Sequence, residues 1–366
     1  MTKEDEIDSF DDLAGMTLDL SDKNIVPDEN GKVEIDVNDA VPQGNMARNM
    51  IQGELKFWIS DLNDFSGMTG VSPKNKPIQN IYITDNEIYV TQVYTKNGKR
   101  NNVKISRCKI LPQNHKLAQA QDSMNLEGVG HGQNLIPYQY NNKQYFIVCA
   151  NAVNNNPTNE KSWEANKIGR IVYDAGTTKT SKNINMLEDT EYSNKTREPF
   201  NNIRRCAVYV SPDNKKILMF KQNTQRAVQY SFYDFDVVKQ VLDSNSAKDM
   251  SFKYSDKLQA ACYDYEINSN DLPVSQLQGI AIDNSLNIYI VCDGNGTYNT
   301  RADLCVIFKK SKRTIYYNVY WDISEEIEIE GIQVCNNKIY IGVSPKNEKS
   351  RNKAYIYSVD NGLIYE

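Results

Sequence analysis

Polar residues recur immediately before the apolar arm of a repeated strand pattern, and they are the side chains best suited to bind a ligand together. Amide and carboxylate groups hydrogen-bond to hydroxyls, and a guanidinium also pairs with phosphates. The turn "GVGHGQN" delivers a histidine to the same position. The candidate ligand-binding residues are therefore Gln79, Asn80, His131, Gln133, Arg205, Gln278 and Glu330.

Signatures of catalysis and of cofactor binding are missing from the sequence. The two histidines, His115 and His131, lack metal-ligand spacing, and no G-x-S-x-G, Walker or dinucleotide-binding motif occurs. The loop from Asp293 to Asp303 lacks an acidic residue at the bidentate position of a calcium loop. A pair of catalytic carboxylates cannot be identified from the sequence, because spacing along the chain does not give the distance between two side chains in the folded protein. We therefore predict no catalytic residue, no metal, no cofactor, and a protein that is not an enzyme.

Hairpins are the elements that must position these candidate residues. Arms of alternating β-branched and aromatic residues flank a short polar turn, as in "IYITDNEIYV", and a third strand-like run often follows. Asp and Asn suit such turns because they cap the local backbone and tolerate left-handed dihedrals. The turns are Asp85-Asn86, Asn141-Asn142, Asp213-Asn214, Asp283-Asn284 and Asn336-Asn337.

Five similar units at irregular spacing predict a repeat architecture, and a closed ring protects most sheet edges. We therefore predict an all-β fold, a five-bladed β-propeller over residues 66–366, with an array of β-sandwiches as the alternative. Either "LIYE" at the end of the chain or the upstream "ELKFWI" could supply the strand that closes the ring. We favour the N-terminal run.

The candidate residues would crowd one mouth of the central channel, because the innermost strand of a blade begins near the axis. Two interpretations remain open. The side chains either line a ligand site or hydrogen-bond to one another and close the channel.

The first 65 residues differ from the rest of the chain. Residues 1–39 contain 13 Asp and Glu but 3 Lys, whereas the remainder has 39 basic and 34 acidic residues, for a net charge of −5 overall. We predict that residues 1–65 form an extended attachment segment that orders on a partner; a disordered acidic tail is the alternative. The acidic start does not resemble a signal peptide, and no run of eighteen apolar residues predicts a membrane span.

Cysteine usage and charge exclude further classes of protein. The seven cysteines form no C-x-x-C pair and mostly lie inside apolar runs, which favours reduced cysteines in a core after synthesis in the cytoplasm. The basic excess of the body is small and forms no stripe interleaved with aromatic residues, so nucleic-acid binding is not predicted.

Three segments carry a resemblance to a known family. "AVYVSPDNKKILMF", "QLQGIAIDNSLNIYIV" and "IEGIQVCNNKIYIGVSPKN" resemble the helveticin J-like proteins, large heat-labile bacteriocins, and "GHGQN" is similar to a segment of that family. The resemblance implies a propeller, action at a bacterial surface, and no catalytic residues to transfer. Similar propellers occur in receptor-binding proteins of phages that infect Gram-positive bacteria.

These observations lead to three functional hypotheses. The first is a non-catalytic protein that binds a Gram-positive wall glycopolymer of the teichoic-acid type. It would sit in several copies, or as a homo-oligomer, on a phage tail through residues 1–65. The second is a helveticin-like bacteriocin, secreted without a classical signal peptide. The third is a hydrolase of the same wall polymer.

Overall fold

The computed structural model describes residues 48–62, 76–154, 163–244, 246–270, 273, 277–292, 303–347 and 353–365. Residues 48–366 form one compact unit. The attachment role predicted for residues 1–47 lies outside the described residues and stays a prediction. None of the helices among the described residues is long and apolar enough to span a membrane.

Strands dominate the body, and they fall into five consecutive groups. The first group is β3 (Ile78–Ile83), β4 (Glu87–Lys96), β5 (Lys99–Leu111) and β6 (Asn114–Glu127). The second is β7 (Leu135–Tyr140), β8 (Lys143–Asn154), β9 (Trp163–Ile171) and β11 (Asn185–Leu187), while β10 (Thr178–Thr180) pairs with β6. The third is β12 (Ile203–Val210), β13 (Lys216–Asn223), β14 (Val228–Asp234) and β15 (Cys262–Ser269).

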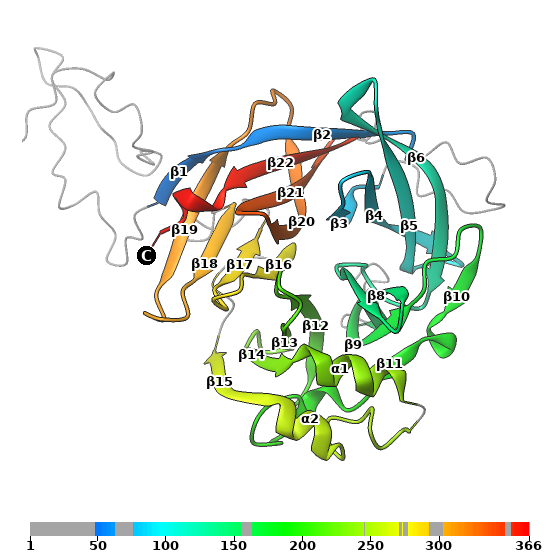
Figure 1. Cartoon of the computed structure of the whole chain (residues 1–366), viewed down its shortest axis with the longest axis vertical. Coiled ribbons are helices and arrows are strands. Elements are labelled where there is room, and N and C mark those ends of the chain that lie inside the picture. The colour runs from blue at the N-terminus through cyan, green and yellow to red at the C-terminus, as the bar shows by residue number, and fades with distance from the viewer. Residues whose placement is uncertain are drawn as a thin grey trace, which may run out of the picture. The chain divides into compact units, whose positions relative to one another are not determined.

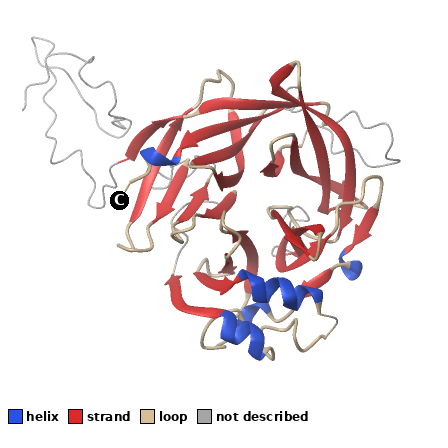
Figure 2. Ribbon diagram, viewed as in Figure 1, coloured by secondary structure: helices blue, strands red, loops and turns tan. Residues whose placement is uncertain are grey.

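The last two groups also receive strands from the start of the described chain. The fourth group is β16 (Gly279–Ile282), β17 (Ile288–Val291), β18 (Leu304–Ile307), β19 (Thr314–Tyr320) and β1 (Arg48–Gln52). The fifth is β20 (Ile327–Cys335), β21 (Lys338–Pro345), β22 (Ala354–Asp360) and β2 (Glu54–Ser60). Two helices, α1 (Phe235–Asp243) and α2 (Asp256–Ala261), follow β14 and lie together at one rim (Figure 2).

All five predicted hairpins are confirmed by antiparallel pairing of the first two strands of each group, and the third strand pairs with the second in each. The turns follow the chemistry expected of them. Asn141 and Asn142 have φ of 48° and 60°, and Asn336 and Asn337 have 49° and 58°. Two left-handed residues between paired strands are the geometry of a type I′ turn, which matches the strand twist.

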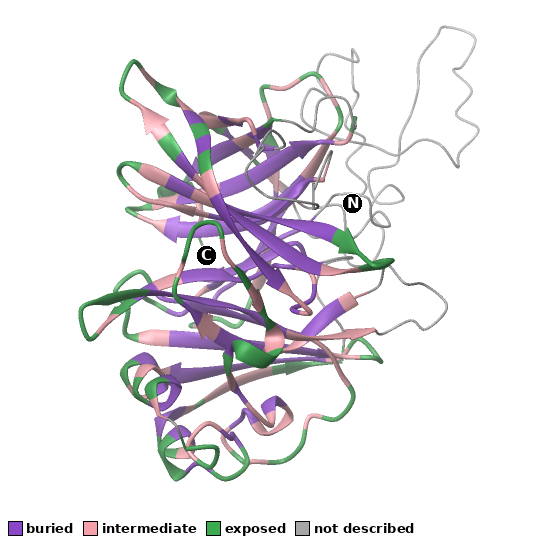
Figure 3. Ribbon diagram, turned by 90° about the vertical axis from the view of Figure 1, so that its right-hand side faces the viewer, coloured by how far each residue is buried: buried purple, intermediate pink, exposed green. Residues whose placement is uncertain are grey.

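The groups surround a common axis (Figure 1). The inner strands contact one another in a cycle from β3 to β7, β12, β16, β20 and back to β3. Most residues of the inner strands are buried, whereas the turns are largely exposed (Figure 3). The molecule is therefore an all-β, β-propeller-like ring, as the hairpin pattern predicted in outline.

The ring is closed by a strand from the N-terminal side, as the sequence favoured. Strand β2 pairs antiparallel with β22 and parallel with β6, so the first and fifth groups share one nine-stranded sheet. Strand β1 pairs parallel with β19. Residues 48–60, which the sequence prediction placed in the attachment segment, thus lie in sheets of the body.

The described cysteines are free thiols, and six of the seven are buried. This agrees with the predicted role of cysteine as a small core residue. Desolvation in the core raises the pKa of Cys149 to about 12, which keeps that thiol protonated and unreactive.

One buried lysine gives a testable pH dependence. Lys221 is fully buried in β13, where its Nζ donates to the carbonyl of Ser193 at 2.9 Å. Burial lowers the pKa of Lys221 to about 7, so the unfolded chain binds more protons than the folded chain between about pH 7 and 10.5. This group therefore destabilises the folded state most at and below pH 7, and less as the pH rises.

We predict that Lys221→Met stabilises the protein at pH 6 by on the order of 1–3 kcal/mol, and that this gain shrinks towards pH 9.5. Urea unfolding at both pH values measures the difference. Lys215→Met is the matched control, because the Lys215 side chain is 72% exposed on the same hairpin. An equal gain at both pH values would show that Lys221 is not the titrating group.

Candidate functional site

The predicted site residues meet at the end of the axis where the inner strands begin. Gln79 Nε2 donates to Glu330 Oε1 at 3.2 Å, which links β3 to β20. Asn80 Nδ2 donates to the carbonyl of Gln133 at 2.5 Å, which links β3 to the segment before β7. The side chains of Gln79, Asn80, Gln133, Gln278 and Glu330 are buried.

The remaining candidates join the same cluster. Arg205 Nη1 donates to the carbonyl of Leu277 at 2.8 Å, and its Nη2 donates to Glu164. His131 Nδ1 lies 3.3 Å from the carbonyl of Trp163, and burial lowers the pKa of His131. Glu164 was not predicted from the sequence, because it lies on the third strand of its group rather than ahead of the first.

Backbones also approach closely at this end. A Cβ added to Gly331, whose φ is +74°, would stand 2.6 Å from Asn80 Cα. A Cβ added to Gly279 would stand 3.0 Å from Gly331 Cα. Most of the candidate side chains therefore hydrogen-bond to one another or to adjacent backbone, which fits one of the two interpretations that the sequence left open. A ligand-binding role for them stays a prediction.

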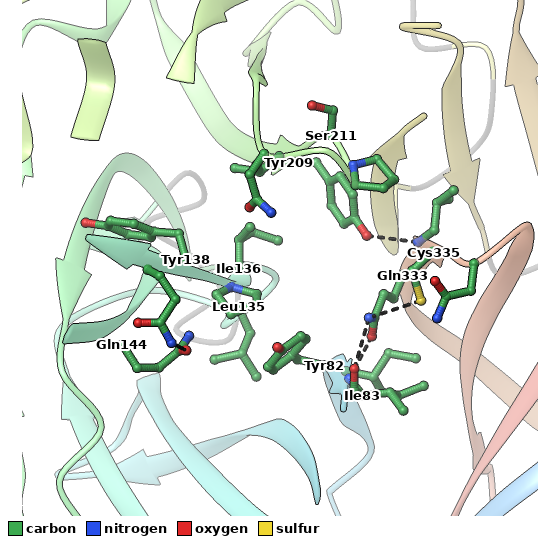
Figure 4. A pocket seen from close by; sticks show the side chains of 18 of the residues that line it. Tyr82, Ile83, Leu135, Ile136, Tyr138, Gln144, Tyr209, Ser211, Gln333 and Cys335 are labelled. Atoms are coloured by element: carbon green, nitrogen blue, oxygen red, sulfur yellow. Dashed lines mark hydrogen bonds between the residues drawn. The ribbon is translucent and has the colours of Figure 1, made fainter. Parts of the chain in front are cut away.

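The opposite end of the axis is hollow. A cavity of about 420 Å³, here called the axial hollow, opens where the inner strands end (Figure 4). Its lining comes from the ends of β3, β12 and β20, from most of β7, from the turns after β12 and β20, from the start of β8, and from α1. The chemically versatile lining residues are Tyr82, Tyr138, Tyr209, Gln139, Gln144, Asn214, Lys239, Gln333 and Asn336.

Side chains from separate strands fix one wall of the axial hollow. Tyr209 Oη accepts a hydrogen bond from the Val334 amide at 2.8 Å, joining β12 to β20. Gln333 Oε1 accepts from the Ile83 amide at 2.7 Å, and its Nε2 donates to the Ile83 carbonyl at 3.2 Å (Figure 4). Tyr209 thus connects the third group to the fifth, and β16 of the fourth group contributes no lining residue. These hydrogen bonds hold the wall in place without a ligand.

Several polar groups in the axial hollow are available to a ligand. The side chains of Asn214 and Asn336 make no hydrogen bond with any residue that the structure describes. Gln139 and Gln144 are exposed and pair across β7 and β8 at 2.5 Å. Lys239 already forms an ion pair with Asp236 at 2.5 Å.

The candidate residues predicted from the sequence lie at the other end of the inner strands, away from this hollow. A signal for it exists. Tyr82 and Tyr138 stand three residues before their turns, and Tyr209 stands four residues before Asp213. An aromatic side chain repeated at the turn end of inner strands must lie near the axis at that mouth.

A protein-family model described as bacteriocin helveticin-J matches residues 57–362, which is most of the chain. The chain belongs to this family. The match confirms the family resemblance of the hairpin segments, while the similarity to phage receptor-binding propellers stays a prediction. No curated protein matches the sequence of this helveticin-J family member.

Solved structures of similar architecture are related only distantly. An exo-β-1,3-galactanase of Phanerochaete chrysosporium shares 7% identity at a TM-score of 0.42, with 82% of this chain and 64% of that chain covered. A periplasmic gluconolactonase of Pseudomonas aeruginosa shares 10% sequence identity at a TM-score of 0.35, with 75% of this chain and 66% of that chain covered. A GDP-Man-dependent mannosyltransferase of Leishmania mexicana shares 7% sequence identity at a TM-score of 0.35, with 84% of this chain and 90% of that chain covered. The chain spans slightly less than two thirds of the first two proteins.

All three of these proteins are enzymes by name, which points away from the sequence prediction that this chain is not an enzyme, and that prediction is withdrawn. The likeness is too distant to carry a reaction or a substrate to this helveticin-J family member.

Proposed function

We propose that this protein binds a sugar-bearing polymer of the Gram-positive bacterial surface in the axial hollow. The observation that carries the proposal is the hollow itself, about 420 Å³ in volume and lined by tyrosines and amides. This volume lies in the range of small-molecule sites. Aromatic rings stack on the apolar faces of sugars, and amides exchange hydrogen bonds with hydroxyls.

The architecture supports this proposal. We propose that the five strand groups are five blades of a propeller, since their inner strands contact one another in a closed cycle. A rigid ring places ligand groups from separate strands around one cavity without ordering a loop, which lowers the cost of binding.

Binding is tested by replacing the exposed amide pair. Gln139→Ala/Gln144→Ala is expected to weaken binding of purified wall glycopolymer by about tenfold, because each lost hydrogen bond contributes roughly 0.5–1.5 kcal/mol. Isothermal titration with polymer from a Gram-positive wall measures the affinity. Gln121→Ala is the matched control, since Gln121 is an exposed amide on β6 outside the hollow. Absence of saturable binding by the unaltered protein would reject the proposal.

Family membership favours a second candidate function, the killing of bacteria after binding. Adding the purified protein to Gram-positive cells is then expected to reduce viable counts. The Gln139→Ala/Gln144→Ala variant would kill less in proportion to its weaker binding. If the protein is shown to saturate the cell surface and viable counts do not fall, killing is rejected and binding alone remains as the proposed function.

A further inference from the structure

A second hollow adjoins the axial hollow at the seam between the first and fifth strand groups. This cavity of about 340 Å³, here called the seam hollow, shares Ile83, Cys335 and Asn336 with its neighbour. The rest of its lining is Phe57, Thr84, Asp85, Ile110, His115 and Tyr340. The two hollows are therefore adjacent, with the shared residues between them, and together they are here called the groove.

The divider between the two hollows is held by hydrogen bonds from one side chain, Gln333. Gln333 holds both the amide and the carbonyl of Ile83, and its Nε2 also lies 3.4 Å from Cys335 Sγ. Asn336 sits in the type I′ turn directly after Cys335, exposed and left-handed. Its unengaged amide is therefore placed to contact ligand groups in either hollow.

The charges of the groove disfavour a phosphate-rich ligand. Lys239 is the one lysine or arginine that lines the described hollows, and Asp236 already neutralises it. In the seam hollow, Asp85 and His115 are exposed and make no hydrogen bond or ion pair with any described residue. A free carboxylate repels a phosphodiester but accepts hydrogen bonds from sugar hydroxyls.

The aromatic residues complete this chemistry. Tyr82, Tyr138 and Tyr209 line the axial hollow, and Phe57 and Tyr340 line the seam hollow. Each hollow thus combines aromatic surface with polar groups that are not committed elsewhere, which is the composition that sugar rings require.

We infer that the groove binds an extended glycan that occupies both hollows at once and is recognised through sugar rings and hydroxyls rather than through phosphates. This inference rests on the proposed function and names its ligand class. The seam hollow adds affinity only for a chain long enough to pass over the divider formed by Ile83 and Cys335.

The experiment combines ligand length with variants in each hollow. The probes are neutral wall polysaccharide fragments of two and of eight sugars, and wall teichoic acid stripped of its sugar substituents. The eight-sugar fragment is expected to bind at least tenfold more tightly than the two-sugar fragment. The stripped polymer is expected to bind at least tenfold more weakly than the eight-sugar fragment, with neutral-glycan affinity changing less than threefold between 50 and 500 mM salt.

Variants locate the gain in affinity. His115→Ala is expected to weaken binding of the eight-sugar fragment about three- to tenfold and to leave the affinity for the two-sugar fragment unchanged. A general loss of stability cannot produce this dependence on ligand length. Asn336→Gly, which keeps the left-handed turn, is expected to weaken binding of both fragments. Asn142→Gly is the control, since Asn142 has a φ of 60° in a type I′ turn outside both hollows.

Each outcome decides between the two proposals. Absence of binding to all probes rejects the proposed function itself. Binding of glycan with equal affinity at both lengths, or with no effect of His115→Ala, rejects the two-hollow inference but keeps the function. Tighter, salt-sensitive binding of the stripped polymer rejects recognition through sugars.

Discussion

Removal of residues 1–60 is expected to open the ring and abolish cooperative unfolding, whereas removal of residues 1–47 is expected to preserve both. The first deletion takes away β2, which pairs with β22 along Glu54–Ile59 and with β6 along Trp58–Ser60. Its loss exposes the edges of two strands at once and removes the strand that joins the sheets of the first and fifth groups. The second deletion leaves the compact unit of residues 48–366.

The energetic cost of losing β2 is large compared with the stability of a domain. Ile59 is fully buried and packs in a cluster with Ile88, Ala354 and Ile356. Removing one such side chain costs about 2–5 kcal/mol, and a whole domain is stable by about 5–15 kcal/mol. Loss of the ladder hydrogen bonds and of the neighbouring β2 side chains adds to this.

Thermal unfolding followed by circular dichroism measures the outcome. A third variant, lacking residues 1–53, removes β1 but keeps β2, and is expected to unfold cooperatively at a moderately lower temperature. This variant is the control that separates the closing strand from the edge strand β1. A protein lacking residues 1–60 that unfolds at the same temperature as one lacking residues 1–47 would show that β2 does not hold the ring.

The strand groups were predictable because their signals are local. An Asn-Asn pair between alternating arms specifies a type I′ turn within a dozen residues, as at Asn336-Asn337, and the pairing partner is the next arm in sequence. The closing strand was predictable in part, since a ring of antiparallel groups needs one more strand and "ELKFWI" has the required pattern. The parallel pairing of β1 with β19 has no local signal and was not predicted.

The candidate site was harder to predict, because which mouth of the axis stays open depends on contacts between non-adjacent strands. The sequence brought Gln79, Asn80 and Glu330 together correctly, but their hydrogen bonds are directed at one another and at backbone. The axial hollow has a wall in which Tyr209 connects to Val334 across the ring. Such a contact depends on three-dimensional side-chain volume and not on strand order.

Glu164→Gln is expected to destabilise the protein by about 3–5 kcal/mol, because it leaves the Arg205 charge buried without its partner. The two side chains are 10% and 12% exposed, and Arg205 Nη2 donates to Glu164 Oε1. Arg205 also donates to the Leu277 carbonyl at 2.8 Å, but a carbonyl carries no formal charge and cannot neutralise the guanidinium. The ion pair therefore connects β9 to β12 at the end of the axis where the inner strands begin.

The effect of this substitution is expected to depend on pH. Burial alone would raise the pKa of Glu164, but the charge and hydrogen bond of Arg205, with the nearby charges of His131 and Arg204, together outweigh burial and hold the pKa below its ordinary value of 4.5. The unfolded chain thus takes up this proton first as the pH falls, so the stabilisation is present above about pH 4.5 and is lost below it. The difference in unfolding free energy between the unaltered protein and Glu164→Gln should shrink as the pH falls from 7 to 3.

Urea unfolding across that pH range measures the difference, and the double variant Glu164→Leu/Arg205→Met tests its cause. Replacing both charges removes the uncompensated guanidinium, so the double variant is expected to be more stable than Glu164→Gln at pH 7. Glu188→Gln is the matched control, since Glu188 forms an ion pair with Lys167 but its side chain is 40% exposed. That exposure predicts a cost below about 1 kcal/mol. Equal costs for Glu164→Gln and Glu188→Gln would show that the axial ion pair is solvated and that this end of the ring is open to water.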